Sequence, residues 1–340
     1  MADKFQGSPS LRALLQSAVP QSSRTALRSS VLPALLTAVS DIAAALRTSG
    51  PVAAEGTSND FGDEQLNVDL SAERAMRTAL ARCPSVATAS SEEDPVETSV
   101  NPDGAEHDGD ATGERYTVAF DPLDGSSIIG PNWSVGAIVG VWDGTSALGR
   151  DPRTGQVAAV LGVFGPRTTA VVAVRVPGSP SDALCLELGL DRAGRWDVVR
   201  DRVRLQLSPP YRTRYFAPAN LRAAADDPGY MSLVTRSVGE RYTLRYSGGL
   251  VPDLVHALVK GHGLYVSPVT PASPPKLRRL YELCPVALIV ECAGGAAVDP
   301  ALGRPVLDAP LAHTDERGGL VCGNRDEVDR ALRILASDTA

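Results

Sequence analysis

Two aspartates three positions apart, Asp121 and Asp124, stand where an apolar run of the sequence (TVAF) meets a turn (DPLDG). Hard divalent cations such as Mg²⁺ take oxygen ligands, and a turn also offers a backbone carbonyl, here that of Leu123. A lone Asp-Pro-x-Asp-Gly segment is more often an ordinary β-turn, since these are turn residues. The apolar run before it favours the other interpretation, in which a strand ends at a metal site.

The residues that follow Asp124 indicate a phosphate site. Gly125 lets the chain turn tightly and approach a ligand closely. The N–H groups and hydroxyls of Ser126 and Ser127 can surround an anion, more so if a helix begins there. A metal site beside a phosphate site is what a metal-assisted phosphatase needs.

Further acidic residues lie earlier in the sequence. Glu92 and Glu93 follow an apolar run at residues 86–89, so they stand at the carboxyl end of a predicted strand, where sites gather in α/β proteins. On a helix, Asp63 and Asp69 would lie nearly two turns apart, so that one face carries both. A solvated acidic surface is the alternative for both pairs, and the sequence leaves it open.

Basic residues mark two places in the second half of the chain. Arg245 and Tyr246 precede a Ser-Gly-Gly turn, and a guanidinium group pairs well with phosphate. Lys276 begins the run KLRR, which indicates either an anion nearby or an exposed charged turn. The four histidines have no partner spacing, and we assign them no role.

The length of 340 residues suits one large domain or two packed subdomains. The formal net charge of −7 argues against nucleic acid and anionic membranes as partners. The five cysteines are scattered without metal-ligand spacing, which fits a reducing compartment. We find no stretch long and apolar enough to span a membrane, and we expect a cytoplasmic protein.

Hydrophobic periodicity predicts the elements that position these residues. Residues 1–30 are predicted to form a loosely ordered arm. Residues 8–30 are rich in Ser, Arg and Leu, as in a transit peptide, but Asp3 and the helix-like run SLRALLQ favour a cytosolic arm. Helices are expected at 32–46, 65–81, 250–260 and from Asn324 to about 337, and strands at 86–89, 116–120, 134–142, 157–164, 168–176 and 263–266. Residues 276–292 are expected to form a helix and then a strand, interrupted at Pro285. Such alternation predicts an α/β (α+β) protein with layered packing.

Taken together, the motifs resemble the fructose-1,6-bisphosphatase family, within the lithium-sensitive, metal-dependent sugar phosphatases. The segments that carry the resemblance are FGDEQLNVD, SSEED, YTVAFDPLDGSSII, VGAIVGVWDG, GQVAAVLGVFGPRTT, RYTLRYSGGLVPD, KLRRLYELCP and ECAGG. Their order and combination are far more specific than any single motif. The family implies an α-β-α-β-α layered fold and a homo-oligomer, either dimer or tetramer. Pro209 and Pro210, within a stretch rich in Arg and Tyr, mark a boundary between a subdomain at 31–207 with the metal and DPLDGSS site and a sugar-binding subdomain at 208–340.

The resemblance assigns roles position by position. The implied metal ligands are Glu92, Asp121, Asp124, Glu282 and the Leu123 carbonyl, with Asp63 beside a further ion. Asp69 and Glu93 are expected to orient and deprotonate the attacking water. The implied substrate contacts are Gly125, Ser126 and Ser127 at the phosphate that is removed, and Asn220, Arg245, Tyr246 and Lys276 around the sugar and its distal phosphate.

The implied activity is hydrolysis of the C1 phosphate of a sugar bisphosphate with two or three Mg²⁺ ions, or Mn²⁺ in their place. Two features are closer to the sedoheptulose-1,7-bisphosphatase branch: the segment FAPANLR, and Val266 where fructose bisphosphatases have a tyrosine. Fructose 1,6-bisphosphate, alone or as a second substrate, is the alternative. An inositol or nucleotide phosphatase and an inactive regulatory protein are further alternatives. The extended C-terminal match argues against the first of these, and the complete set of carboxylates against the second.

Two departures predict an enzyme that responds neither to AMP nor to dithiol reduction. Residues 49–58 contain no cysteine, whereas similar plastid sedoheptulose bisphosphatases carry a regulatory pair in that region. Residues 30–33 (SVLP) replace the Gly-Glu-Leu-Thr turn of the fructose-bisphosphatase AMP site, although Arg115 and Tyr116 resemble the rest of it. Activity is measured with millimolar AMP, and after oxidation and then reduction of the thiols. A several-fold change in either assay would contradict this prediction.

Overall fold

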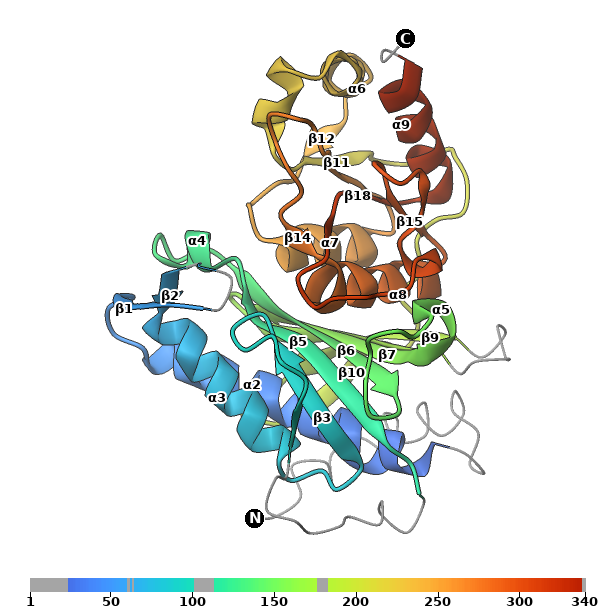
Figure 1. Ribbon diagram of the computed structural model, residues 1–340. Helices are drawn as coiled ribbons and strands as arrows, with labels where there is room; N and C mark the ends of the chain where they lie inside the picture. The colour runs from blue at the N-terminus through green and yellow to red at the C-terminus, as the bar shows by residue number, and fades with distance from the viewer. Residues whose placement is uncertain (1–23, 60–61, 63, 101–112, 176–182, 338–340) are drawn as a thin grey trace.

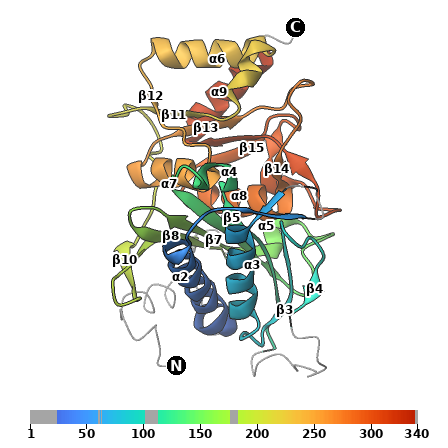
Figure 2. The ribbon, with the colours of Figure 1, turned by 90° about the vertical axis from the view of Figure 1, so that its left-hand side faces the viewer.

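The structure is a computed structural model, and it describes residues 24–59, 62, 64–100, 113–175 and 183–337 (Figure 1). Within these ranges the chain forms five layers, in which two sheets alternate with three layers of helices (Figure 2). One sheet has eight strands and the other has six. The predicted α/β class and α-β-α-β-α layering are therefore confirmed.

The first helical layer consists of α2 (Leu32–Thr48) and α3 (Asn67–Leu80), which cover one face of the eight-stranded sheet. A π-helical turn, Leu27–Val31, leads into α2, so this helix begins earlier than predicted. In α2 the buried residues Leu35, Val39 and Ile42 recur at helical spacing and form one apolar stripe. The first 23 residues of the predicted arm lie outside the described residues.

The helix Leu27–Thr48 corrects one expectation. Its 22 residues have a mean hydropathy of 1.6 in their most apolar window, so by length and composition it could span a membrane. Half of that window is buried inside the protein. The stripe on α2 belongs to the core cluster that also contains Val160 and Val172 of the sheet. The apolar side chains thus already have partners, as in the core helix of a folded domain.

The eight-stranded sheet fixes the position of the acidic residues. Among its strands only β3 and β5 pair in parallel, with Ser91 opposite Phe120. All nine residues of β5 are buried, because the sheet is covered on both faces. The strands, in spatial order, are β10 (Trp196–Arg200), β9 (Leu184–Leu190), β8 (Thr168–Val174), β7 (Gln156–Phe164), β6 (Val135–Asp143), β5 (Tyr116–Asp124), β3 (Val86–Ser91) and β4 (Thr98–Ser99).

The middle layer contains α7 (Leu250–Lys260), as predicted, and α8 (Cys284–Cys292). A short strand, β14 (Leu277–Arg278), and a π-helical segment, η4 (Arg279–Leu283), precede α8, so the expected helix followed by a strand was wrong. Pro285 lies in the first turn of α8, where a missing N–H is tolerated. All but one of the residues of α8 are buried, and a helix that is apolar all round has no period by which to recognise it.

The six-stranded sheet and an outer helical layer complete the fold. The outer helices are α6 (Pro228–Gly239) and α9 (Arg325–Ser337). Asn324 precedes α9 as expected, but its amide oxygen accepts a hydrogen bond from the Gly263 N–H, 2.9 Å away, instead of capping the helix. The strands, in spatial order, are β12 (Thr243–Leu244), β11 (Tyr215–Pro218), β13 (Leu264–Ser267), β18 (Leu320–Gly323), β15 (Ala296–Asp299) and β16 (Arg304–Pro305). Shorter elements are β1 (Ala54–Ser58), β2 (Glu64–Leu66), α4 (Ser126–Ile129), α5 (Pro152–Gly155), η3 (Leu221–Ala225), η5 (Val306–Asp308) and β17 (Arg317–Gly318).

A partly buried glutamate ties the middle helix α8 to the first sheet. Glu291 of α8 accepts hydrogen bonds from both terminal nitrogens of Arg153, at 3.1 and 3.2 Å, and from Arg175 at 2.8 Å. Arg153 belongs to α5, and Arg175 follows β8 directly. Bidentate arginine–carboxylate pairs are geometrically specific, so this cluster fixes α8 against the sheet that carries the acidic residues.

Candidate active site

The parallel pairing of β3 and β5 brings two acidic segments together. Both strands end at the same edge of the sheet, and the Glu92 N–H still donates to the Phe120 carbonyl, 3.1 Å away. Glu92 therefore lies beside Asp121, the next residue of β5. The two residues are 29 positions apart in the sequence (121 − 92), and the sheet register brings them together.

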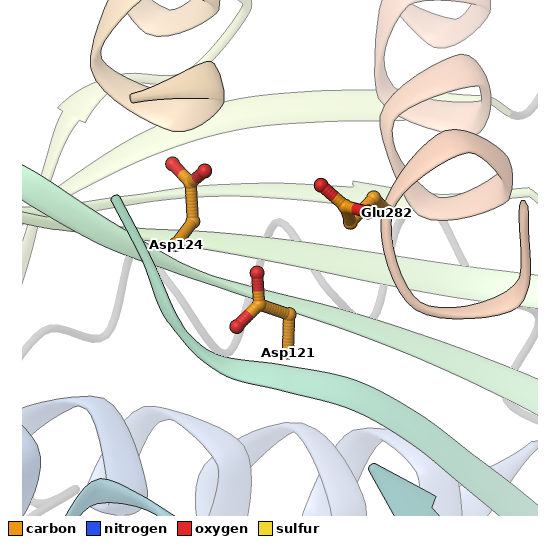
Figure 3. Close-up of side chains that lie close together, drawn as sticks. All are labelled: Asp121, Asp124 and Glu282. Carbon is orange, nitrogen blue, oxygen red and sulfur yellow. The ribbon is translucent and has the colours of Figure 1, made fainter. Parts of the chain in front are cut away.

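Three carboxylates form the centre of the site (Figure 3). Asp121, Asp124 and Glu282 each offer one oxygen atom, and these atoms all lie within 4.8 Å of one another. The first two belong to β5, and Glu282 comes from the π-helical segment η4, which packs against that strand. All three are buried, with exposed fractions of 6, 7 and 7 per cent.

The cluster is electrostatically incomplete without a cation. Burial, followed by the charges of Glu92 and Asp124, raises the pKa of Asp121 well above its ordinary range. Burial and then Glu92 do the same for Glu282. Burial raises the pKa of Asp124 to about 6. Because buried like charges destabilise one another and carboxylates are the preferred ligands of hard cations, this donor set fits a divalent metal ion.

Hydrogen bonds from the backbone orient two of these carboxylates. The Leu123 N–H donates to Asp121 over 2.9 Å. The N–H groups of Leu250 and Val251, at the start of α7, donate to the two oxygens of Asp124 over 3.0 and 2.7 Å. Asp124 thus caps α7 from another layer of the fold, a role that the sequence did not indicate. Leu123 itself is buried, at the position predicted for the carbonyl ligand.

Arg278 is a member of the site that sequence reasoning did not single out. Its buried guanidinium group forms an ion pair with Glu92, whose side chain is 20 per cent exposed. The Arg278 N–H also donates to Glu282, 2.5 Å away. The run KLRR was the available signal, but only the structure distinguishes Arg278, which is buried, from Lys276, which is exposed.

Asp69 and Glu93, the predicted acid–base pair, lie close together. Asp69 is buried at the start of α3, where one carboxylate oxygen accepts the Leu66 N–H over 2.9 Å. The other oxygen is buried and has no hydrogen-bond partner in the described part of the chain. Burial, with the nearby charge of Glu93, raises the pKa of Asp69 to about 6. The Gln65 side chain donates to Glu93 over 2.5 Å.

Glu73 is a further acidic residue near this pair, one turn after Asp69 on α3. Burial raises its pKa, and the charge of Glu93 adds to the shift, while Arg77 opposes it through a 2.7 Å ion pair. Asp63, which the resemblance placed beside a further ion, lies outside the described residues.

The predicted phosphate turn follows Asp124 directly. Gly125 has φ = +93°, and a Cβ atom there would lie 3.3 Å from side-chain atoms of Ile128 and Val135, so both the backbone and the space favour glycine. Ser126 and Ser127 begin α4 and are exposed, so their hydroxyl and N–H groups are accessible to a ligand.

The residues predicted to hold the sugar surround a separate part of the site. The Tyr246 hydroxyl, on a side chain that is partly exposed, bonds to the backbone of Asn220, and the Asn220 side chain donates to Ser273. The Arg245 guanidinium group is exposed and lies 5.6 Å from the ring centroid of Tyr215. Lys276 is exposed and has no ionic partner among the described residues, so the structure does not join it to the other three.

Two neighbours in β13 point to opposite faces of the six-stranded sheet. Val266 is fully buried in the cluster beneath the outer helices, so this position supplies no hydroxyl group. Tyr265 belongs to the core cluster on the other face. Burial, with the nearby groups of Tyr246 and Asp253, raises the pKa of its hydroxyl well above the ordinary value. Sequence analysis did not identify Tyr265, because an aromatic residue in a strand usually signals core packing.

Two family models match the chain. Residues 13–190 match the model described as fructose-1,6-bisphosphatase, N-terminal domain, and residues 210–336 match its C-terminal domain. Among solved structures, one assigned as a sedoheptulose-1,7-bisphosphatase from Toxoplasma gondii superimposes with a TM-score of 0.83 at 35% identity, covering 96% of this chain and 98% of the other. The holo form of Leishmania major fructose-1,6-bisphosphatase gives a TM-score of 0.78 at 26% identity and covers 95% of this chain and 98% of that one.

Curated relatives agree with this result. A chloroplastic sedoheptulose-1,7-bisphosphatase from Chlamydomonas reinhardtii is 40% identical over 80% of this chain, and the match spans 64% of that relative's own length. A class 1 fructose-1,6-bisphosphatase from Syntrophotalea carbinolica is 34% identical over 85% of this chain and 83% of its own. From the two family models and these relatives we conclude that the chain belongs to the fructose-1,6-bisphosphatase family.

Proposed function

We propose that this protein hydrolyses the C1 phosphate of sedoheptulose 1,7-bisphosphate with the help of Mg²⁺, two or three ions per site, or Mn²⁺. The observation that supports the proposal best is the buried cluster of Asp121, Asp124 and Glu282 beside an accessible Ser-Ser turn. A site with this much uncompensated negative charge needs cations. A phosphate ester is also negatively charged, so it can approach these carboxylates only when cations lie between them.

Asp121, Asp124 and Glu282 would hold the metal together with Glu92 and the Leu123 carbonyl, and Asp63 would contribute to a further ion. When bound, the ions supply charge that neutralises the phosphate oxygens, acidifies a water molecule and stabilises the departing oxygen. The backbone hydrogen bonds to Asp121 and Asp124 hold these carboxylates in place before any ligand arrives.

The remaining residues bind the substrate and move a proton. Asp69 and Glu93 would orient the attacking water and accept its proton. This role is supported by the pKa of Asp69, about 6, and by its buried oxygen, which has no hydrogen-bond partner among the residues that the structure describes. Ser126 and Ser127 would bind the phosphate that leaves. The sugar and the distal phosphate would be bound by Asn220, Arg245, Tyr246 and Lys276. Gly125 would let the backbone approach the reacting phosphate closely.

The sedoheptulose substrate is favoured over fructose 1,6-bisphosphate by sequence similarity and by one side chain. Three plant and algal sedoheptulose bisphosphatases are 37 to 40% identical to this chain, while class 1 fructose bisphosphatases are 32 to 35% identical. Val266 offers no hydroxyl to a distal phosphate. Fructose 1,6-bisphosphate remains the second candidate. We also propose a homo-oligomer in the cytoplasm that binds neither nucleic acid nor membranes.

Replacing Asp121 by asparagine should reduce metal-dependent phosphate release by about a hundredfold or more, because a neutral amide replaces a charged ligand in the cluster. Asparagine keeps the acceptor for the Leu123 N–H, so the fold should survive, as thermal unfolding would verify. Asp124→Asn is a less suitable test, because it also removes an acceptor at the start of α7. Near-normal turnover of Asp121→Asn at ordinary Mg²⁺ would contradict the assignment of the cluster.

The metal-free protein should lose stability as the pH rises. The pKa values of Asp69 and Asp124 in the folded state are about 6, above their ordinary value of 3.8. Between pH 3.8 and about pH 6 the folded state therefore binds more protons than the unfolded state. The free energy of unfolding falls as the pH rises through this range, by an amount on the order of 1–3 kcal/mol. Thermal unfolding in chelator should give a lower Tm at pH 7.5 than at pH 5. Added Mg²⁺ should raise the Tm more at pH 7.5 than at pH 5.

A matched comparison uses the Asp121→Asn variant. Without metal at pH 7.5 it should be at least as stable as the wild type, since a buried charge has been removed from a repulsive group. Its Tm should respond little to Mg²⁺. A metal-free Tm that increases with pH, or a variant that Mg²⁺ stabilises as strongly as the wild type, would refute the electrostatic account of the cluster.

Sedoheptulose 1,7-bisphosphate should have a higher kcat/KM than fructose 1,6-bisphosphate. A missing hydrogen bond to a charged phosphate is worth about tenfold to a hundredfold. The measurement is phosphate release from the two substrates in direct competition. A clear preference for the fructose substrate would reverse the assignment and leave the sugar bisphosphatase activity itself intact.

A further inference from the structure

The turn between Tyr246 and α7 is held by a single buried carboxylate. Asp253, in the first turn of α7, is 6 per cent exposed. One of its oxygens accepts the Ser247 N–H over 2.7 Å, and the other accepts the Gly248 N–H over 3.4 Å. The Ser247 hydroxyl also bonds to Asp253 and accepts the Gly249 N–H over 3.3 Å. The backbone N–H groups of residues 247–249 therefore all donate hydrogen bonds, either to Asp253 or to the Ser247 hydroxyl that is bonded to Asp253.

This turn lies directly against the predicted phosphate turn. A Cβ atom on Gly125 would lie 3.5 Å from the Cα of Gly249. Cβ atoms on Gly248 and Gly249 would lie 3.3 and 3.4 Å from the side chain of Ile128. Gly248 has φ = +106°, which ordinary side chains rarely adopt. The turn at Gly125 and the turn at residues 247–249 are therefore in close contact at their glycines, and a larger side chain there would push them apart.

The start of α7 connects this contact to the carboxylate cluster. Asp124 accepts the N–H groups of Leu250 and Val251, which follow the turn immediately. Arg245 and Tyr246 precede the turn and stand at its exposed end. One short segment therefore joins the metal-binding carboxylate, the turn for the reacting phosphate and the side chains for the distal phosphate.

We propose that Asp253 is a positioning residue that sets the distance between the two phosphate-binding parts of the site. It fixes residues 247–249 against the Gly125 turn, and so fixes where Tyr246, the residue directly before the turn, stands relative to the reacting phosphate. Asp253 does not itself contact the substrate in this account, since it is buried and both of its oxygens accept backbone N–H groups. The inference rests on the proposed function. It adds that Asp253 helps to determine how long a sugar bisphosphate fits the site.

The test compares a bisphosphate with a monophosphate in the Asp253→Asn variant. Asparagine keeps the size of the side chain and one acceptor, but directs an amide N–H₂ group at a backbone N–H. For sedoheptulose 1,7-bisphosphate we expect kcat/KM to fall about tenfold to a hundredfold, chiefly through KM. Fructose 1-phosphate has no distal phosphate, so its kcat/KM should change far less. An equal loss on both substrates would mean that Asp253 only supports the fold, and no loss on either would also overturn the proposal.

A matched control is Asp191→Asn. Asp191 likewise accepts two backbone N–H groups of a turn, those of Ala193 and Arg195, each over 2.8 Å. It lies between β9 and β10, at the far edge of the eight-stranded sheet from β5. The ratio of kcat/KM for the two substrates should remain at the wild-type value. A selective loss in this variant as well would show that the effect is not specific to the turn at residues 247–249.

Amide hydrogen exchange separates this inference from the proposed function. In Asp253→Asn, the amides of Ser247 and Gly248 should exchange faster, while those of β5 keep their wild-type rates. Unchanged exchange at these two amides would refute the positioning role whatever the activity. If the wild type released no phosphate from either bisphosphate, the proposed function would fail, and the exchange result would still decide whether Asp253 holds the turn.

Discussion

The mutual repulsion of three buried carboxylates is the constraint around which this structure is arranged. One oxygen atom from each of Asp121, Asp124 and Glu282 lies within 4.8 Å of the others, and the three residues are buried. Removing charges from water is costly unless partners compensate for it. The compensation here comes from backbone N–H groups and from Arg278 beside Glu92, and the donor set fits a cation that would complete it. Leu250 and Val251 belong to α7 and Arg278 to β14, so elements outside the first sheet meet β5 at this point.

The layered architecture explains how that meeting is kept rigid. The parallel pair β3 and β5 delivers Glu92 and Asp121 to one edge of the sheet, and η4 brings Glu282 down from the middle layer. Glu291 holds the continuation of η4, α8, against the same sheet through two arginines. Asp124 holds the start of the other middle helix, α7. The site therefore lies between the start of α7, which is bonded to Asp124 of β5, and η4, which packs against the same strand.

The same arrangement accounts for the residues that sequence reasoning missed. Arg278, Asp253 and Tyr265 each act through a contact with a residue distant in sequence or with a backbone N–H group. Nothing in their local sequence distinguishes them from an exposed cation, an acid in a first helical turn and a core aromatic residue. Asp124 shows the converse case: its place in the motif indicated a ligand, while its bonds to α7 became apparent only from the packing of the layers.

The sequence by itself determined the local chemistry: the strand that ends in Asp121-Pro-Leu-Asp-Gly, the helix 250–260, and the strands with continuous apolar runs. These depend on short-range periodicity and turn preferences, which act within a few residues. The family resemblance supplied the layered fold and the set of carboxylates. Tertiary structure decided which acidic residues lie together in one cluster. It also decided that Arg278 is buried while Lys276 is exposed, and that α8 continues past Pro285 without a break. Those outcomes depend on strand register and on burial by segments that are distant in the sequence. The cost of burying a charge or placing a proline is set by neighbours that the local sequence does not contain.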